Sequence, residues 1–322
     1  MPEESITFVI PHKGREELLR ETLASISAQE GGHAISVVVV TQNTELAAAT
    51  IAIANTLDAQ LLYADDNLTI SALRNLGAAQ SNSTYLAFLD ADIALSANWL
   101  SALLEELLAD HRRVLVSAIQ RSPSGATMLE QIRTVLSNAV TDAAVEFLPG
   151  RNLLLRRDAY ESVGGFPDHL RTCEDYWFTS RVGEAGLLWY SSAASYVHLG
   201  EDRSLRALFA KEIWRGQSNL QAIGGRRIGP GEWPSFLVPP WISLLGLLAL
   251  VLLLAGQGLV ASACAILAGL PFAAYVTRLY FLGRGQLSLP HVVAFYAVYF
   301  PARAWGTFLG TFRGLGSELH DH

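Results

Sequence analysis

Short apolar runs alternate with amphipathic stretches along the first part of the chain. The uncharged runs are typical of buried strands, and they cover residues 6–10, 36–40, 61–63 and 85–89. Between them the 3.6-residue period of apolar positions predicts helices at 16–28, 45–55, 71–80 and 97–109. This alternation predicts an α/β fold with a mostly parallel mixed sheet between helices. Ligands of such sheets bind at the carboxyl ends of the strands, so the residues after each strand are the first candidates for a site.

The pattern changes after Phe236, where two long apolar segments follow each other. Residues 237–256 and 259–282 are each long enough to cross about 30 Å of hydrocarbon as a helix, and the short break makes them a hairpin. The connecting loop carries no charge, so the positive-inside rule predicts that both flanks are cytoplasmic. A buried core hairpin in a soluble protein is the alternative. The flanking basic residues are Arg203, Arg206, Lys211, Arg215, Arg226, Arg227, Arg278 and Arg284.

A third apolar stretch, residues 290–313, fits two descriptions. Pro301 and Arg303 interrupt it, and beyond them small and polar residues share one helical face while large apolar residues share the other. This pattern favours an amphipathic helix that lies in the membrane interface, and a third span is the alternative. We therefore expect two domains, a soluble-type domain over residues 1–225 and a membrane domain over residues 226–322.

Composition supports this division. Charged residues form 16% of the chain, below the roughly 25% of a soluble domain, and only six of them follow Phe236. The formal net charge of −7 argues against a nucleic-acid partner, and two cysteines argue against a disulfide scaffold. Residues 1–4 begin no recognisable signal peptide, so we expect the first domain to stay on the side of the membrane where it is made.

Two acidic residues follow the strand predicted at 85–89. Asp90 and Asp92 are spaced so that both carboxylates can reach one divalent cation if the chain turns there. Mg²⁺ and Mn²⁺ prefer such hard oxygen ligands and often combine them with substrate phosphates. The alternative is that an Asp at this strand end caps the next helix. Ser96, which we expect at that N-cap, weakens the alternative.

A second acidic pair, Glu174 and Asp175, precedes Tyr and Trp at the start of an apolar helix. A general base that faces a sugar ring would suit this setting. Thr172 and Asp175 also have the spacing of a capping box, which is a purely structural role. Two further residues carry the same ambiguity: Arg74 could clamp a phosphate or be solvated, and His198 could be a metal ligand or structural.

Taken together and in their order along the chain, these motifs resemble the family 2 glycosyltransferases with a GT-A fold. The resemblance covers about residues 5–215. It implies an inverting transfer from a nucleotide-diphosphate sugar, with Mg²⁺ or Mn²⁺ as cofactor. The stretches that carry it are residues 9–15, 72–77, 87–92, 163–166, 173–175 and 197–198.

The resemblance also implies a role for individual residues. Asp175 would be the catalytic base with Glu174 beside it, and the metal would lie on Asp90, Asp92 and His198. The residues implied at the nucleotide and donor are Pro11, His12, Arg15, Gln42, Asn43, Arg74, Asn75, Asp90 and Gly150.

Two departures from the family pattern bear on the substrate. Residues 41–44, after the second strand, lack the acid that family members usually place on the base or ribose, so Gln42 or Asn43 would substitute and the base stays open. The QxxRW motif of processive members is also missing, because residues 214–217 reverse its order. We therefore expect a non-processive enzyme.

The apolar hairpin predicts an acceptor that is itself in the membrane. We expect a multi-pass protein of the cell (inner or plasma) membrane whose catalytic domain is cytoplasmic and whose acceptor is a lipid-linked glycan of envelope or exopolysaccharide assembly. A polyprenyl-phosphate monoglycosyltransferase is the alternative among enzymes. A catalytically silent membrane assembly partner is the alternative of another class.

Overall fold

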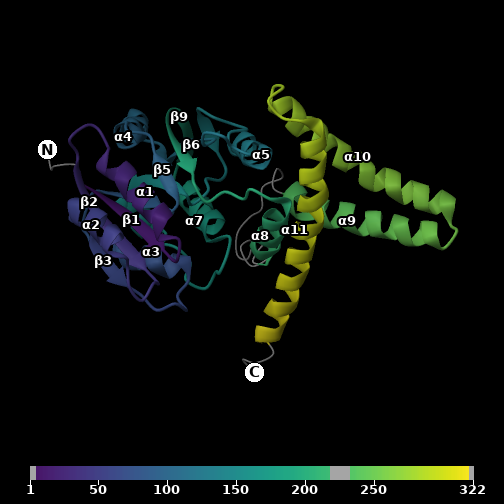
Figure 1. Cartoon of the computed structure of the whole chain (residues 1–322), viewed down its shortest axis with the longest axis horizontal. Coiled ribbons are helices and arrows are strands. Elements are labelled where there is room, and N and C mark those ends of the chain that lie inside the picture. The colour runs from purple at the N-terminus through teal and green to yellow at the C-terminus, as the bar shows by residue number, and fades with distance from the viewer. Residues whose placement is uncertain (1–4, 218–232, 319–322) are drawn as a thin grey trace. The chain divides into compact units, whose positions relative to one another are not determined.

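The computed structural model describes residues 5–217 and 233–318, and the chain divides into two compact units (Figure 1). The first comprises residues 1–124 and 137–201, and the second comprises residues 125–136 and 202–322. The expected domain boundary at 225 and 226, the basic residues at 226 and 227, and the first four residues lie outside the described parts of the chain.

The first unit contains a mixed sheet with the strand order β3-β2-β1-β4-β8-β6-β9-β5, in which β7 also pairs with β9. Strands β3, β2, β1 and β4 run parallel, as do β6 and β9, whereas β8, β5 and β7 pair with their neighbours in the antiparallel sense. The predicted α/β fold is therefore confirmed. The strands are β1 (Ser5–His12), β2 (Ala34–Thr41), β3 (Gln60–Tyr63), β4 (Tyr85–Leu89), β5 (Ile93–Leu95), β6 (Arg113–Arg121), β7 (Ala143–Val145), β8 (Asn152–Arg156) and β9 (Leu187–His198).

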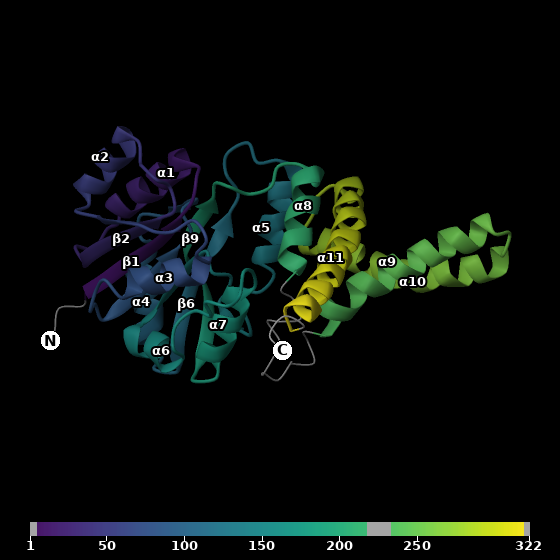
Figure 2. The same cartoon turned by 90° about the horizontal axis from the view of Figure 1, so that it is seen from below.

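Helices cover both faces of this sheet, because successive strand residues point to opposite sides. Ile6 and Phe8 of β1 pack with α1, α2 and α4, whereas Val9 packs with α3, α6 and α7 on the other face. Figure 2 shows α1 and α2 on one side of β1 and β2, with α6 and α7 on the other. These helices are α1 (Glu16–Ser27), α2 (Ala48–Thr56), α3 (Ile70–Ala78), α4 (Trp99–Ala109), α6 (Arg157–Ser162) and α7 (Glu174–Gly183).

The N-cap expected at Ser96 is wrong. Helix α4 begins at Trp99 and its N-cap is Asn98, whereas the Ser96 hydroxyl donates to Asn98 Oδ1 at 2.8 Å and accepts from Ser195 N at 3.1 Å. The reason is strand β5, which pairs with β9 and ends immediately before Ser96. The hydroxyl therefore extends a strand pairing instead of capping the helix.

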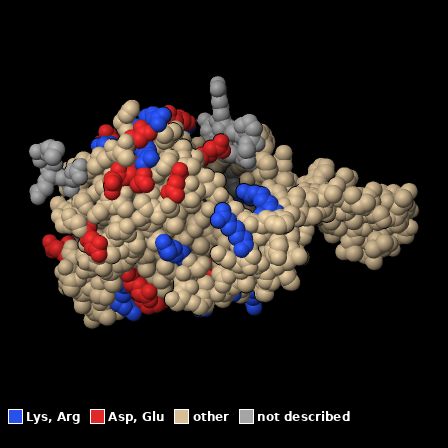
Figure 3. All heavy atoms as spheres, turned by 90° about the horizontal axis from the view of Figure 1, so that it is seen from above, with Lys and Arg blue, Asp and Glu red and all other residues tan. Residues whose placement is uncertain are grey.

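The second unit contains helices alone among its described residues. Two of these, α9 and α10, are long and apolar enough to cross a membrane and pack against each other as a hairpin, with a turn at Gly256, whose φ is +76°. Figure 3 shows no charged side chain on this face of the hairpin's far end. The helices are α5 (Met128–Ser137, most of which lies in this unit), α8 (Leu205–Gly216), α9 (Trp233–Leu254), α10 (Gly258–Leu282) and α11 (Leu289–Glu318).

Helix α11 continues through Pro301 and crosses α8 at close range. A Cβ atom at Gly306 would overlap the Ile213 carbonyl, and one at Gly310 would overlap the Gln217 carbonyl. Small residues at these two positions allow the backbones to approach, as in membrane helix pairs. The predicted small and polar face of α11 thus packs on α8, whereas Trp305 on the other face is 52% exposed. That this helix lies in the membrane interface stays a prediction.

A buried carboxylate joins three helices of the second unit. Glu212 of α8 is 0% exposed and pairs with Arg133 of α5 at 2.5 Å, with Arg303 of α11 at 2.5 Å and with Arg215 at 2.8 Å. Burial alone would raise the pKa of this carboxyl group, but the three guanidinium groups outweigh it and lower the pKa to about 2. The charged form of Glu212 therefore stabilises the packing of this unit.

Candidate active site

Arg74 of α3 joins the two acidic pairs that the sequence predicts as site residues. Its side chain is 1% exposed; Nη2 donates to Asp90 Oδ1 at 2.8 Å and Nη1 donates to Glu174 Oε1 at 2.9 Å. Nη2 also donates to the Gly150 carbonyl at 3.2 Å. The solvated role that the sequence left open for Arg74 is therefore wrong. Residues from three distant stretches converge on one buried guanidinium.

The charges at Arg74 compensate one another. A buried cation is costly unless it is paired, and although burial lowers the pKa of Arg74, Asp90 and Glu174 raise it above the usual value. The Phe166 ring lies 4.9 Å from Cζ and adds a cation–π contact. Burial, together with the adjacent Asp175, raises the pKa of Glu174 to about 7, although Arg74 opposes the shift. Arg74 thus favours the charged form of Glu174 against the effect of burial.

Asp175 lies in the first turn of α7 with its carboxylate directed at Gly150. Its Oδ2 accepts a hydrogen bond from Gly150 N at 3.1 Å, and the residue is only half-buried. The capping box considered for Thr172 and Asp175 does not form: the N-cap is Cys173 with φ of 62°, and the Thr172 hydroxyl has no partner among the described residues. The Asp175 carboxylate instead bonds two backbone groups: Oδ1 accepts from Tyr176 N in the first turn of α7 at 2.8 Å, and Oδ2 accepts from Gly150 N.

Position 150 leaves little room for a side chain. A Cβ atom there would come within 3.0 Å of both Arg74 Nη2 and Asp175 Cβ. Since the backbone of Gly150 also bonds both side chains, it fixes their relative position. The structure thus brings together five residues of the predicted site: Arg74, Asp90, Gly150, Glu174 and Asp175.

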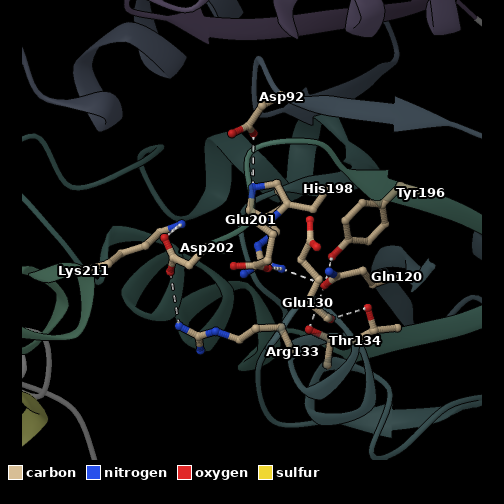
Figure 4. Close-up of polar contacts among 12 residues, drawn as sticks. Asp92, Gln120, Glu130, Arg133, Thr134, Tyr196, His198, Glu201, Asp202 and Lys211 are labelled. Atoms are coloured by element: carbon tan, nitrogen blue, oxygen red, sulfur yellow. Dashed lines mark hydrogen bonds and ion pairs between the residues drawn. The ribbon is translucent and has the colours of Figure 1, made fainter. Parts of the chain in front are cut away.

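The second part of the site is the pair Asp92 and His198, shown in Figure 4. Strand β5 pairs with β9 so that Ile93 lies opposite His198, and Leu199 N donates to the Asp92 carbonyl at 2.8 Å. This pairing places His198 Nε2 3.4 Å from Asp92 Oδ1. On the other side, Arg15 Nη2 donates to Asp92 Oδ2 at 2.9 Å.

Of the three predicted metal ligands, the structure joins Asp92 and His198, and it directs Asp90 Oδ1 to Arg74. Among the described residues, no three His, Cys, Asp or Glu side chains form a ready metal cluster. The donor chemistry of the pair nevertheless fits a divalent cation, because Glu201 Oε2 lies 2.9 Å from His198 Nδ1. When the Nδ1–H group of His198 donates to Glu201, Nε2 and Asp92 Oδ1 are both acceptors, so a cation or a proton between them satisfies both.

Residues at the carboxyl ends of β1 and β2 are hydrogen-bonded to one another. Pro11 is buried in β1, and His12 Nδ1 lies 2.8 Å from Thr41 Oγ1; burial lowers the pKa of His12. Gln42 Nε2 donates to the Asp65 carbonyl at 2.7 Å, and Asn43 Oδ1 accepts from Gly14 N at 2.7 Å. Gln42 and Asn43 therefore connect the loop after β2 to the loops after β3 and β1 by hydrogen bonds. Their contacts with a nucleotide stay predictions.

Asn75 anchors residues 163–166, one of the stretches that carry the family resemblance, which contains Gly164 and Gly165. Its Nδ2 donates to the Phe166 carbonyl and to Asp168 Oδ1, both at 2.8 Å, and its Oδ1 accepts from Tyr160 Oη at 2.8 Å and from Phe166 N at 2.9 Å. Gly165, with φ of +81°, lies against this amide. Asn75 thus positions the loop beside Arg74, and its predicted contact with the donor stays untested.

Three site residues escaped the sequence analysis. Arg151 Nη1 donates to Gln120 Oε1 at 2.8 Å and lies 3.7 Å from Glu201 Oε2. Although burial disfavours the charge of Arg151, Tyr196 and Glu201 raise its pKa. The only signal in the sequence for Arg151 is that it follows the predicted site residue Gly150. The sequence pattern contains no signal for Glu201. Asp65 could have been found, because it follows β3 at the same edge as Gln42.

In comparisons with known proteins, residues 7–164 match the family model described as "Glycosyl transferase family 2". The chain is similar to the glycosyltransferase AglE of Haloferax volcanii, with 26% identity over 167 residues that cover 50% of this chain and 54% of AglE. It is also similar to a pre-mycofactocin glycosyltransferase of Mycobacterium tuberculosis, with 25% identity over 171 residues that cover 50% of this chain and 36% of that protein. The match thus spans about half the length of the first relative and less of the second.

A solved structure with a similar fold is the mannosyltransferase PcManGT from Pyrobaculum calidifontis, in complex with GDP-Man and Mn²⁺. The TM-score is 0.57 with 17% sequence identity, and the match covers 95% of this chain and 84% of that one. At this identity the likeness concerns the fold alone. It agrees with the GT-A architecture expected from the sequence.

Proposed function

We propose that this chain, whose residues 7–164 form a glycosyl transferase family 2 domain, is a non-processive, inverting glycosyltransferase. It moves one sugar per cycle from a nucleotide-diphosphate sugar to an acceptor at the membrane. The observation that supports this most is the convergence on Arg74 of Asp90, which follows β4, and Glu174, which precedes Asp175 in α7. The family match and the complex of PcManGT with GDP-Man support the class of donor.

Asp175 is the base in this proposal. Its carboxylate takes the proton of the acceptor hydroxyl while the acceptor oxygen bonds to C1 of the sugar. The bond from C1 to the diphosphate oxygen breaks, and the nucleoside diphosphate leaves with the electron pair. Attack from the face opposite the leaving group inverts the configuration at C1. Partial exposure lets an acceptor reach Asp175, and the bond from Gly150 N holds the carboxylate in place.

Asp92 and His198 hold the divalent cation in this proposal, with Asp90 between them and Arg74. When bound, Mg²⁺ or Mn²⁺ stabilises the negative charge that develops on the departing diphosphate. The Mn²⁺ in the PcManGT complex supports this cofactor class. Arg74 keeps Glu174 and Asp90 in position, so the acidic groups are oriented before substrates arrive.

The acceptor is a lipid-linked glycan of envelope or exopolysaccharide assembly. The apolar hairpin supports this part of the proposal, because Leu254 and Leu259 near its turn are 80% and 89% exposed. Such surface is costly in water and favourable in hydrocarbon. The protein is then a multi-pass protein of the cell (inner or plasma) membrane, with its catalytic domain in the cytoplasm.

The test uses the full chain in lipid nanodiscs with Mn²⁺ and a panel of nucleotide-diphosphate sugars. Each donor is offered with bare polyprenyl phosphate and with glycosylated lipid. Transfer of one sugar to glycosylated lipid supports the proposal, whereas transfer to bare lipid phosphate would make the protein a polyprenyl-phosphate monoglycosyltransferase. If no donor gave either sugar transfer or metal-dependent hydrolysis, the result would contradict enzymatic activity. It would indicate a catalytically silent assembly partner.

A further inference from the structure

His198 is held on the side away from Asp92 by a residue that the proposed mechanism does not use. Glu201 lies three residues beyond His198, its side chain is 1% exposed, and its Oε2 lies 2.9 Å from His198 Nδ1 (Figure 4). A carboxylate can only accept at this distance, so the Nδ1 atom carries the proton. In the neutral ring Nε2 then keeps its lone pair, and it is Nε2 that faces Asp92.

The turn between the two residues is fixed against Asp92. Leu199 N donates to the Asp92 carbonyl at 2.8 Å. Gly200 follows, and a Cβ atom there would overlap Asp92 Oδ2 and lie within 2.5 Å of Arg15 Nη1. A residue with a side chain at position 200 would therefore disturb Asp92, and the chain beyond this glycine brings Glu201 to the imidazole.

Glu201 is also supported from its other side. Arg151 Nη1 lies 3.7 Å from Oε2, and the same nitrogen donates to Gln120 Oε1 at 2.8 Å. A buried carboxylate needs such a cation, because burial of an unpaired charge is strongly unfavourable. Arg151 therefore supplies a nearby positive charge for Glu201, and the chain of contacts runs from Arg151 through Glu201 and His198 to Asp92.

We infer that Glu201 is the positioning residue for metal binding at this site: it fixes the His198 tautomer that presents Nε2 beside Asp92. The inference rests on the proposed function, in which Asp92 and His198 hold the divalent cation. It adds a residue that touches neither the cation nor the substrates. Outer residues that orient a ligating imidazole typically change metal affinity by about 10- to 100-fold when they are removed.

The test compares Glu201→Ala and Glu201→Gln in the full chain in nanodiscs. The dissociation constant for Mn²⁺ is measured by electron paramagnetic resonance, with the nucleoside diphosphate present. We expect Glu201→Ala to bind Mn²⁺ about 10- to 100-fold more weakly. Glu201→Gln keeps an oxygen that can accept from Nδ1 and should retain most of the affinity. Equal affinity of Glu201→Ala and wild type would overturn the inference.

A matched control separates this role from a loss of stability. Glu106 is another carboxylate of the same unit that pairs with an arginine, Arg113, and accepts from Ser191 Oγ at 2.8 Å. Glu106→Ala should lower the melting temperature without changing the Mn²⁺ affinity. If it weakened Mn²⁺ binding as much as Glu201→Ala, the effect would be general destabilisation and the inference would fail.

A second readout needs no metal. The ¹⁵N shifts of the His198 ring, assigned by difference from His198→Gln, report the tautomer in the metal-free protein. We expect the Nδ1–H form in wild type and a shift toward Nε2–H in Glu201→Ala; an Nε2–H wild type would overturn the inference. If Mn²⁺ affinity fell in His198→Ala but not in Glu201→Ala, the inference alone would fail. If it fell in neither, the proposed metal site would fail as well.

Discussion

Gly150 donates its backbone N–H to Asp175 Oδ2 at 3.1 Å, while its carbonyl accepts from Arg74 Nη2 at 3.2 Å. One peptide segment thereby sets the position of the candidate base relative to the buried guanidinium. The arrangement depends on the missing side chain, because a Cβ atom would meet both partners at 3.0 Å.

Gly150→Ala should therefore impair sugar transfer more than it impairs folding. Neighbouring atoms must give by a few tenths of an ångström, and misplacement of a reacting group by about 1 Å can cost about 100-fold in rate. We expect kcat to fall about 10-fold or more with a nearly unchanged melting temperature. Steady-state transfer kinetics and thermal unfolding measure the two effects. A wild-type kcat in Gly150→Ala would show that this contact does not set the geometry of Asp175.

The pair of Arg74 and Glu174 should be coupled energetically. Arg74→Met leaves two carboxylates near a buried apolar side chain, and loss of one partner of a buried pair typically costs about 3–5 kcal/mol of unfolding free energy. Adding Glu174→Gln should recover part of that loss, because it removes a buried carboxyl group that has lost its partner. Denaturant unfolding of the single and double variants measures the coupling. Strictly additive losses would contradict it.

Glu212 should make the stability of the protein depend on acid pH. Its pKa is lowered from 4.5 to about 2, so its contribution is present above about pH 4.5 and is lost as the pH falls toward 2. At pH 7 we expect Glu212→Gln to lower the unfolding free energy by about 3 kcal/mol, and the difference from wild type should shrink below pH 4.5. Unfolding at several pH values tests this, with the exposed Glu105→Gln as control. If the difference in unfolding free energy between wild type and Glu212→Gln stayed constant between pH 7 and pH 3, the prediction would be wrong.

The crossing of α8 and α11 should tolerate no larger side chain. The leucine side chain of Gly306→Leu would collide with the Ile213 carbonyl. We therefore expect α11 to move away from α8 and the melting temperature to fall. Gly246→Leu in α9 is the matched control, because a Cβ atom there has no neighbour within 4 Å among the described residues. Thermal unfolding of both variants in the same detergent gives the comparison. Equal melting temperatures would mean that the close crossing does not contribute.

The parts of this molecule that sequence could predict are those with a local signature. The buried strand at residues 85–89 and the acids that follow it are visible as a pattern, and so is the apolar hairpin. The partners of Arg74 are not, because Asp90 and Glu174 lie 16 and 100 residues away and only the folded sheet brings them together. Glu201 lies only three residues from His198, but its burial beside Arg151, which is distant in the sequence, is also visible only in the folded chain.

Local signals also misled where tertiary contacts competed with them. Ser96 has the residue type of an N-cap, but the unpredicted strand β5 takes the preceding residues and pairs the hydroxyl with Ser195 instead. Thr172 and Asp175 have capping-box spacing, yet Cys173 in a left-handed conformation is the N-cap of α7, and the Asp175 carboxylate bonds Tyr176 N and Gly150 N instead. Cap signatures describe what a residue can do locally, and longer-range partners decide between these options.

The role of Asp175 is tested most directly by Asp175→Asn in the full chain, with donor binding and sugar transfer measured on the same preparation. Asparagine keeps the shape and can still accept from Gly150 N, but it cannot take a proton. We predict donor affinity within about threefold of wild type and a loss of transfer of about 100-fold or more, whereas Asp92→Ala should lose both binding and transfer. Transfer by Asp175→Asn at the wild-type rate would contradict the account.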